Sequence, residues 1–153
     1  MNIRSKGEAL IKSFESCRLE AYQDGGGVWT IGWGHTGPDV HPGLKITQVQ
    51  ADALFDRDIA RFEREVTSLL TATVSQNQFD ALVSFAYNCG SDIDADTKAE
   101  GLGDSTLLKL VNAYRFEEAV KEFPKWCKDN GVVVRGLLRR RNAEAKLFEM
   151  PDA

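Results

Sequence analysis

Two acidic side chains and a hydroxyl stand at a spacing suited to acid-assisted attack by water on an acetal. Glu15, Asp24 and Thr30 lie within residues 14–37, with eight residues between the two acids and five between Asp24 and Thr30. Glycosidic cleavage needs a proton donor for the leaving oxygen and usually a second carboxylate. Glu15 follows Phe14 at the end of an apolar-faced segment, where partial burial would favour the protonated carboxyl. We expect Asp24 to be ionised and to orient a water that Thr30 also binds.

Each of these three residues also has an ordinary structural interpretation. A Glu near a helix end is usually a solvated charge, and an Asp before Gly usually belongs to a turn. A Thr in a strand is usually explained by β-propensity. The residue types alone therefore leave catalysis and plain surface chemistry both open.

A short helix over residues 5–16 is expected to carry the first acid. Ser5 and Glu8 form an S-x-x-E pattern, which is typical of a helix start. The apolar residues that follow fall on one helical face, and they are Leu10, Ile11 and Phe14. This helix would present Glu15 at its carboxyl end.

The other two residues are expected on a small antiparallel hairpin. Residues 19–23 and 28–33 are rich in β-formers, and three glycines at 25–27 supply a turn that tolerates positive φ. The hairpin would present Asp24 and Thr30. We expect a β-rich lobe over about 17–45.

The remainder of the chain has helical periodicity. Thr47 with Gln50 and Ser75 with Gln78 repeat the capping pattern ahead of apolar residues at helical spacing. Three further helices are predicted near 105–113, 116–123 and 136–148. The predicted fold is therefore α+β and mostly helical: one catalytic domain over 1–153, with a helical body at about 47–148 joined to the β-rich lobe by the first helix. A cleft is expected between the two lobes.

Composition narrows the classes of function. The 153 residues carry a net charge of −4, so no overall basic field favours nucleic acid. The chain has no run of about 18 apolar residues and no apolar signal-peptide centre, so we expect synthesis in the cytoplasm without a membrane anchor. Cys17, Cys89 and Cys127 are expected to be free thiols, with one oxidised pair as the alternative.

Four motifs in order, between residues 8 and 148, resemble the phage-type lysozymes, glycoside hydrolase family 24. The first joins Glu15 through Tyr22-Gln23-Asp24 to Thr30-Ile31-Gly32-Trp33-Gly34-His35-Thr36, as in that family's E-x8-D-x5-T signature. The other three are Gln78-Phe79-Asp80-Ala81-Leu82 through Phe85-Ala86-Tyr87-Asn88-Cys89-Gly90, Ser105-Thr106-Leu107-Leu108, and Gly136-Leu137 with Arg140-Arg141 and Glu144.

The resemblance implies a lysozyme-like fold and an endolysin. Such a muramidase cuts the β-1,4 bond between N-acetylmuramic acid and N-acetylglucosamine in peptidoglycan. By matched position, Glu15 is the general acid, and Asp24 with Thr30 holds the attacking water in an inverting reaction. His35 would brace the cleft without reacting. Four residues are candidates to line the sugar cleft, although packing or capping explains each equally well: Trp33, Thr36, Ser105 and Thr106.

Two other functions stay open. A lytic transglycosylase on a similar scaffold would need the acid but no water-holding pair, and Asp24 with Thr30 argues against it. A non-catalytic wall-binding or inhibitory module would be expected to lack one of the three site residues, and all three are present. The hydrolase is the favoured interpretation.

The charged segments predict little further chemistry. Residues 92–96 resemble the start of a calcium loop, but Thr97 and Gly103 stand where that loop needs Gly and Glu. We therefore expect a solvated loop over 91–104, no metal and no cofactor. Arg139, Arg140 and Arg141 begin a basic final helix that is expected to pack on the body with its arginines solvated or paired.

The partners follow from the resemblance. An alternative role for the basic final helix is contact with anionic outer-membrane lipid or wall polymer. We expect a monomer that acts on peptidoglycan glycan strands, binds no nucleic acid, and reaches the periplasm and wall through a holin pore.

Overall fold

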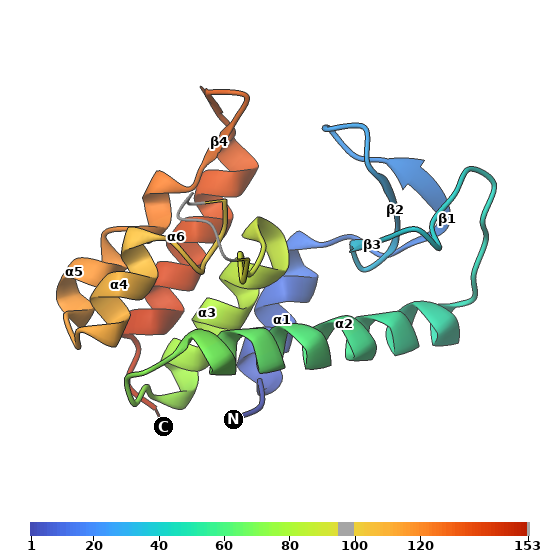
Figure 1. Cartoon of the computed structure of the whole chain (residues 1–153). Coiled ribbons are helices and arrows are strands. Elements are labelled where there is room, and N and C mark those ends of the chain that lie inside the picture. Colours follow the sequence, from blue (N-terminus) through green and yellow to red (C-terminus); the bar gives the residue numbers. More distant parts are fainter. Residues whose placement is uncertain (95–99, 153) are drawn as a thin grey trace.

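The computed structural model describes residues 1–94 and 100–152, and it has a small sheet at one end of a long helix and a helical bundle at the other (Figure 1). The long helix is α2, Gln48–Leu69. Its first half contacts the sheet and its second half packs on the bundle. This helix therefore connects the two parts, and the mixed α+β class predicted from the sequence is confirmed.

The first helix begins differently from the prediction. Helix α1 covers Ser5–Phe14 with Arg4 at its N-cap position, so Ser5 is already helical. The backbone N–H of Arg4 donates to the Asp80 carboxylate at 3.3 Å, and that of Ile3 donates to Glu63 at 2.6 Å. The expected capping box is therefore wrong: the Asp80 carboxylate from another helix binds the N–H of the N-cap residue in its place, and Glu63 binds the N–H of the residue before it.

The sheet contains three antiparallel strands, β1 (Arg18–Gln23), β2 (Trp29–Gly32) and β3 (His35–Thr36). Tyr22 pairs with Thr30, whereas Arg18 pairs with Gly32, so the register shifts within β1. Strand β3 was not predicted. It pairs Thr36 with Thr30 and makes β2, which carries Thr30, the central strand.

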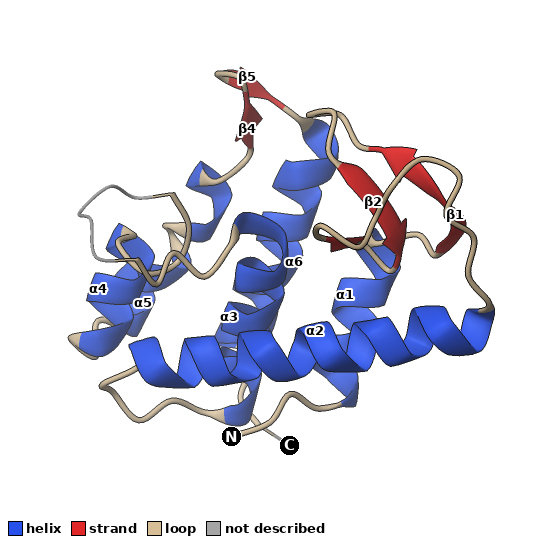
Figure 2. Cartoon of the chain, turned by 45° about the vertical axis from the view of Figure 1, so that its right-hand side comes forward, coloured by secondary structure: helices blue, strands red, loops and turns tan. Residues whose placement is uncertain are grey.

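Helix α3 (Gln76–Cys89) is the centre of the bundle and is buried along nearly its whole length (Figure 2). It packs against α1, α2 and the last helix, α6 (Arg135–Glu149), which explains why its apolar residues do not form a single stripe. The capping boxes predicted at Thr47 and Ser75 are both present. Local hydrogen bonds therefore fix where α2 and α3 begin.

The C-terminal third is broken into short elements before the last helix. These are α4 (Thr106–Asn112), α5 (Phe116–Val120), the 3-10 helix η1 (Phe123–Lys125), the hairpin strands β4 (Lys128–Asp129) and β5 (Val132–Val133), and α6 (Arg135–Glu149). The helix predicted over 116–123 ends at Val120, and Pro124 lies in η1. The β4–β5 hairpin was not predicted. Figure 2 places it at the start of α6.

Aromatic packing under α3 gives the first testable prediction. The Phe85 side chain is fully buried, and its ring makes edge contacts with Phe123 and Trp126 at centroid distances of 5.9 and 5.3 Å. Phe85→Ala should lower the free energy of unfolding by about 3–5 kcal/mol, because it leaves a cavity that cannot close fully. Urea unfolding followed by circular dichroism measures this.

Val49→Ala is the matched control, since Val49 is 78% exposed on α2. Its effect should stay within about 0.5 kcal/mol. A Phe85→Ala effect no larger than that of the control would contradict the packing described.

Candidate active site

The carboxylate of Glu15 is held at the carboxyl end of α1. Glu15 is the C-cap residue, and its backbone N–H donates to the carbonyl of Ile11. Its side chain is 20% exposed, and Oε1 accepts a hydrogen bond from Nη1 of Arg140 at 2.7 Å. A helix end and a buried arginine from α6 therefore fix this side chain from two directions.

A glycine makes room for the same carboxylate. Gly34 has φ +86°, and a Cβ at this position would lie 2.8 Å from Oε2 of Glu15. A side chain here would be strained by the backbone and would also displace the carboxylate. The second glycine of the sequence Gly-Trp-Gly-His is thus explained by the close approach of Glu15.

Asp24 begins the turn between β1 and β2. Its Oδ1 accepts from the backbone N–H groups of Gly26 and Val28, at 2.8 and 2.9 Å. Among the described residues Oδ2 has no hydrogen-bond donor, and the residue is exposed. One carboxylate oxygen therefore builds the turn, and the other is open to water.

Thr30 lies on β2 and is only 4% exposed. Its hydroxyl donates to the backbone carbonyl of Val28 at 3.0 Å, which leaves the oxygen free to accept. Because Val28 also donates to Asp24, one peptide segment holds both residues. The hairpin thus places them as the sequence led us to expect.

Tyr22 is a residue on which the charges of both Glu15 and Asp24 act. Burial raises the pKa of Tyr22, and the negative charges of Glu15 and Asp24 raise it further. The Arg18 guanidinium, 4.2 Å from the ring centroid, opposes this shift. Tyr22 pairs with Thr30 in the sheet. This phenol therefore lies within electrostatic reach of both carboxylates, and the sequence reasoning had not singled it out.

Two arginines of the final helix are buried, unlike their exposed neighbour. Arg140 is 3% exposed and Arg141 is fully buried, whereas Arg139 is exposed. Arg140 contacts Glu15, and Arg141 binds Glu144 through Nε at 2.6 Å. The expectation that these arginines are paired is confirmed for Arg140 and Arg141. The Arg-Arg-x-x-Glu pattern had pointed to these two arginines, but not to the contact of Arg140 with Glu15.

His35 connects the sheet to the long helix. Its Nδ1 lies 2.7 Å from Asp58 on α2, and its Nε2 lies 3.0 Å from Asp39. Hydrogen bonding to Asp58 raises the pKa of His35 against the effect of burial, and Asp39 adds to the rise. The hydrogen bond between His35 and Asp39 also lowers the pKa of Asp39. His35 therefore joins β3 to α2, and its role in bracing a substrate cleft stays a prediction.

The four candidate sugar-contacting residues lie in different surroundings. Thr36 is exposed on β3 beside Thr30, and Thr106 is exposed at the start of α4, which Figures 1 and 2 place away from the sheet. The indole N–H of Trp33 donates to Asp52 at 2.9 Å, and its carbonyl accepts from Tyr87. Trp33 thus ties the sheet to α2 and α3.

The prediction that Ser105 lines the sugar cleft is wrong. It is fully buried, and its hydroxyl caps α4 by donating to Leu102 and accepting from the N–H of Leu108. No part of it is left for a sugar, because the helix end takes up the hydroxyl. Capping, the alternative kept open above, is the role that the structure gives this residue.

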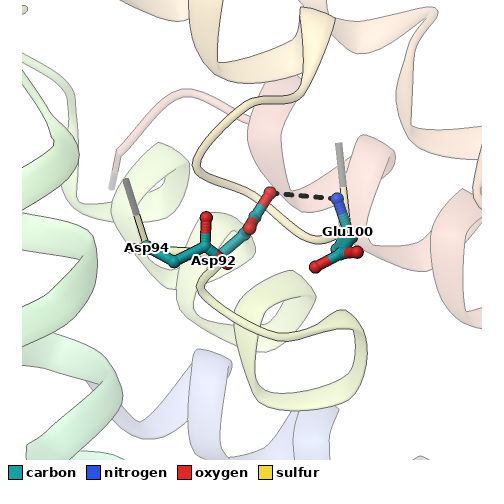
Figure 3. Close-up of side chains that lie close together, drawn as sticks. All are labelled: Asp92, Asp94 and Glu100. Atoms are coloured by element: carbon teal, nitrogen blue, oxygen red, sulfur yellow. Dashed lines mark hydrogen bonds between the residues drawn. The ribbon is translucent and has the colours of Figure 1, made fainter. Parts of the chain in front are cut away.

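Three acids of the loop over 91–104 meet at one point (Figure 3). Carboxylate oxygens of Asp92, Asp94 and Glu100 lie within 4.8 Å of one another, and the N–H of Glu100 donates to Asp92 at 3.0 Å. Asp96 and Thr97, which also belong to the calcium-like pattern, lie outside the described residues. The three cysteines are free thiols, as expected.

Comparison with known proteins identifies the family of this chain. Residues 12–144 match the family described as "Phage lysozyme". The chain belongs to the phage lysozyme family. It is 45% identical over 150 residues to an endolysin of Bacillus phage B103, covering 97% of this chain and 54% of that protein. It is 40% identical over 153 residues to an endolysin of Acyrthosiphon pisum secondary endosymbiont phage 1, covering 97% of this chain and 99% of that protein.

Solved structures resemble this phage lysozyme chain over nearly its whole length. The muramidase domain of SpmX from Asticaccaulis excentricus has a TM-score of 0.84 and 38% identity, with 98% of this chain and 99% of that chain covered. An endolysin from Escherichia coli O157:H7 phage FAHEc1 has a TM-score of 0.82 and 35% identity, with 97% and 94% covered. The lysozyme-like fold predicted from the sequence is thereby confirmed.

Two further facts bear on the whole protein. The chain spans about half the length of the Bacillus phage endolysins it matches, at 54% and 55%. In the part of the chain that the structure describes, none of the helices has the length and apolar character needed to cross a bilayer.

The His35 contacts predict a pH-dependent contribution to stability. Because its folded pKa is raised above the ordinary 6.5, the His35 contribution is full below 6.5 and is lost as pH rises through the folded value. Asp39 contributes to stability in a lower pH range. Its contribution to the free energy of unfolding is full above pH 3.8 and is lost as pH falls through the lowered pKa of the folded state. His35→Gln should therefore lower the Tm most near pH 5–6, because the His35 contribution to the free energy of unfolding is complete there.

Thermal unfolding of both proteins from pH 4 to 9 tests this. His41→Gln is the control, because His41 is exposed and its imidazole hydrogen-bonds to the carbonyl of Pro42 without an acidic partner among the described residues. A wild-type-minus-variant difference for His35→Gln that stays constant from pH 5 to pH 9 would refute the prediction.

Proposed function

We propose that this chain is an endolysin that hydrolyses the β-1,4 bond between N-acetylmuramic acid and N-acetylglucosamine in bacterial peptidoglycan. The observation that carries the proposal is that the two carboxylates have different surroundings. Glu15 is partly buried and bound to Arg140, whereas Asp24 is exposed with one oxygen open to water. Membership of the phage lysozyme family, with relatives named as endolysins, supports it.

The proposed reaction uses Glu15 as general acid. Protonated Glu15 gives its proton to the glycosidic oxygen as the bond to the anomeric carbon breaks. Charge then develops on Glu15, and the Arg140 guanidinium stabilises it. Water held by Asp24 and Thr30 attacks the anomeric carbon from the opposite face and gives its proton to Asp24. The products are a reducing end and an alcohol, with inversion at the anomeric carbon.

Lytic transglycosylation is the competing chemistry. It would use the acid alone and end in a 1,6-anhydro sugar. The shared attachment of Asp24 and Thr30 to the Val28 backbone favours hydrolysis, because it preserves a site for the water. A non-catalytic wall-binding module is disfavoured, since nothing in its role would need Gly34 to leave room for Glu15.

The biological setting belongs to the same proposal. We place residues 1–153 in one catalytic domain. We place the substrate glycan strand across the sheet, beside Thr36. Synthesis occurs in the host cytoplasm, a holin pore releases the monomer, and lysis follows at the end of infection. Contact with an anionic envelope would use exposed cations of α6 such as Arg139 and Lys146, since Arg140 and Arg141 are buried.

Glu15→Gln tests the function directly. Clearing of a peptidoglycan suspension should fall by roughly 10²–10⁴-fold, because glutamine cannot donate the proton. Glu20→Gln is the matched control: the same change at an exposed position on β1 should leave the rate near that of the wild type. Retained clearing by Glu15→Gln, with a folded circular dichroism spectrum, would overturn the mechanism.

Product analysis separates the two chemistries. Mass spectrometry of the wild-type digest should show reducing ends, which carry the mass of one added water per cut. A digest of 1,6-anhydro ends would assign the chain to lytic transglycosylases instead.

A further inference from the structure

A cluster of buried charged groups lies directly behind Glu15. Arg140, Arg141 and Glu144 on α6 are 3%, 0% and 0% exposed, and Ser84 on α3 is fully buried. Buried ions are costly unless they are paired and hydrogen-bonded. Of these four residues, Arg140 is the one bonded to the proposed general acid, Glu15. The burial of the other three needs a separate explanation.

Glu144 is the hub of this cluster. Its Oε1 accepts from Nε of Arg141 at 2.6 Å, and its Oε2 accepts from Nη2 of Arg141 at 3.1 Å. The same Oε2 accepts from the Ser84 hydroxyl at 2.6 Å and from Nε of Arg140 at 3.3 Å. The Glu144 carboxylate is therefore shared between two guanidinium groups and is held by a third donor.

Arg140 is fixed at three points of its planar head group. Nε binds Glu144, Nη2 binds the Ser84 carbonyl at 3.2 Å, and Nη1 binds Glu15. A guanidinium is rigid, so the first two contacts determine where Nη1 points. The position of Oε1 of Glu15 thus depends on Glu144 and Ser84, although neither is bonded to it.

The cluster behind Glu15 contains more positive than negative charges. Two arginines share the single charge of Glu144, so one positive charge remains, and an ionised Glu15 would balance it. Cys89 also contacts Arg141, but burial raises its thiol pKa to about 11, so it stays neutral. The net charge behind Glu15 is therefore set by Arg141 and Glu144 together with Arg140.

The other groups that face Glu15 are largely neutral. They include the phenols of Tyr22 on β1 and Tyr87 on α3. Burial raises the pKa of both phenols, and the negative charge of Glu15 raises it further. Asp24 on the hairpin acts on the same Tyr22, and Asp58 and Arg61 on α2 act on Tyr87. Within the described residues, Arg140 is the cation bonded to the Glu15 carboxylate.

We propose that Arg141 and Glu144 form a positioning pair that orients Arg140 and sets the charge it presents to Glu15. This inference rests on the proposed role of Glu15 as general acid. It assigns to α6 the tuning of the proton-donating group, through a pair of residues that meet neither substrate nor water. The pair acts by charge as well as by position, and the two effects are separable.

Three variants test the charge. Glu144→Gln leaves two unopposed arginines, which favour ionised Glu15, so the alkaline limb of the pH–rate profile should move down by roughly 0.5–1 pH unit. Arg141→Gln removes one of the positive charges, so the limb should move up. The double variant restores the wild-type net charge with two neutral side chains, so its limb should return to the wild-type position.

A fourth variant tests position alone. Glu144→Asp keeps the charge but shortens the side chain, so the rate should fall at every pH with the alkaline limb unmoved. Arg64→Gln is the control: the same change at an exposed arginine of α2 should leave both rate and limb as in wild type. Circular dichroism and Tm establish that each variant is folded.

The outcomes are distinguishable. Opposite shifts in the two single variants, with recovery in the double, support the proposal. Shifts in the same direction, or lower rates with no shift in either single variant, overturn it. If one single variant does not fold, the other together with the double variant decides. An active Glu15→Gln refutes the proposed function, whereas an inactive Glu15→Gln with unmoved limbs refutes only this inference.

Discussion

The contact between Arg140 and Glu15 is the interaction on which the active-site geometry depends. It joins residues 125 positions apart in the sequence, one at the end of α1 and the other buried in α6. Burying a guanidinium costs free energy unless each of its donors finds an acceptor. Glu15, Glu144 and the Ser84 carbonyl supply those acceptors. The same bonds that make the burial of Arg140 tolerable therefore also place the proposed acid.

The hairpin that faces Glu15 is built on a different principle. Its contacts span two to four residues, and the Val28 backbone serves both Asp24 and Thr30. Such a turn can hold its geometry with little support from the rest of the fold. Gly34 is where the two parts meet, because its missing side chain is the space that the Glu15 carboxylate occupies. A long-range network thus holds Glu15, and a local turn independently holds Asp24.

Separate contacts hold the sheet against the helices. His35 binds Asp58, and Trp33 binds Asp52, so two residues after β2 are tied to α2. The Tyr87 hydroxyl bonds to the Trp33 carbonyl and links α3 to the same short segment. The relative position of sheet and bundle sets the relation of Asp24 to Glu15. Stability and proposed catalysis are therefore connected through these few contacts.

The sequence by itself determined what depends on short windows. The order and spacing of Glu15, Asp24 and Thr30 are properties of the sequence, and their catalytic roles stay predictions. The capping boxes at Thr47 and Ser75 and the periodic helices depend on residues that lie a few positions apart. Local hydrogen bonds and the helical repeat explain these successes, since both act over three or four positions.

Tertiary structure decided everything that depends on burial. Only packing shows that Asp80 takes the place of the Ser5 cap, that Ser105 is sealed inside, and that Arg140 turns inward while Arg139 stays in solvent. A basic run reads the same in sequence whether it is solvated or paired. The difference comes from partners 56 to 125 residues away, whose approach is fixed by how α1, α3 and α6 pack together.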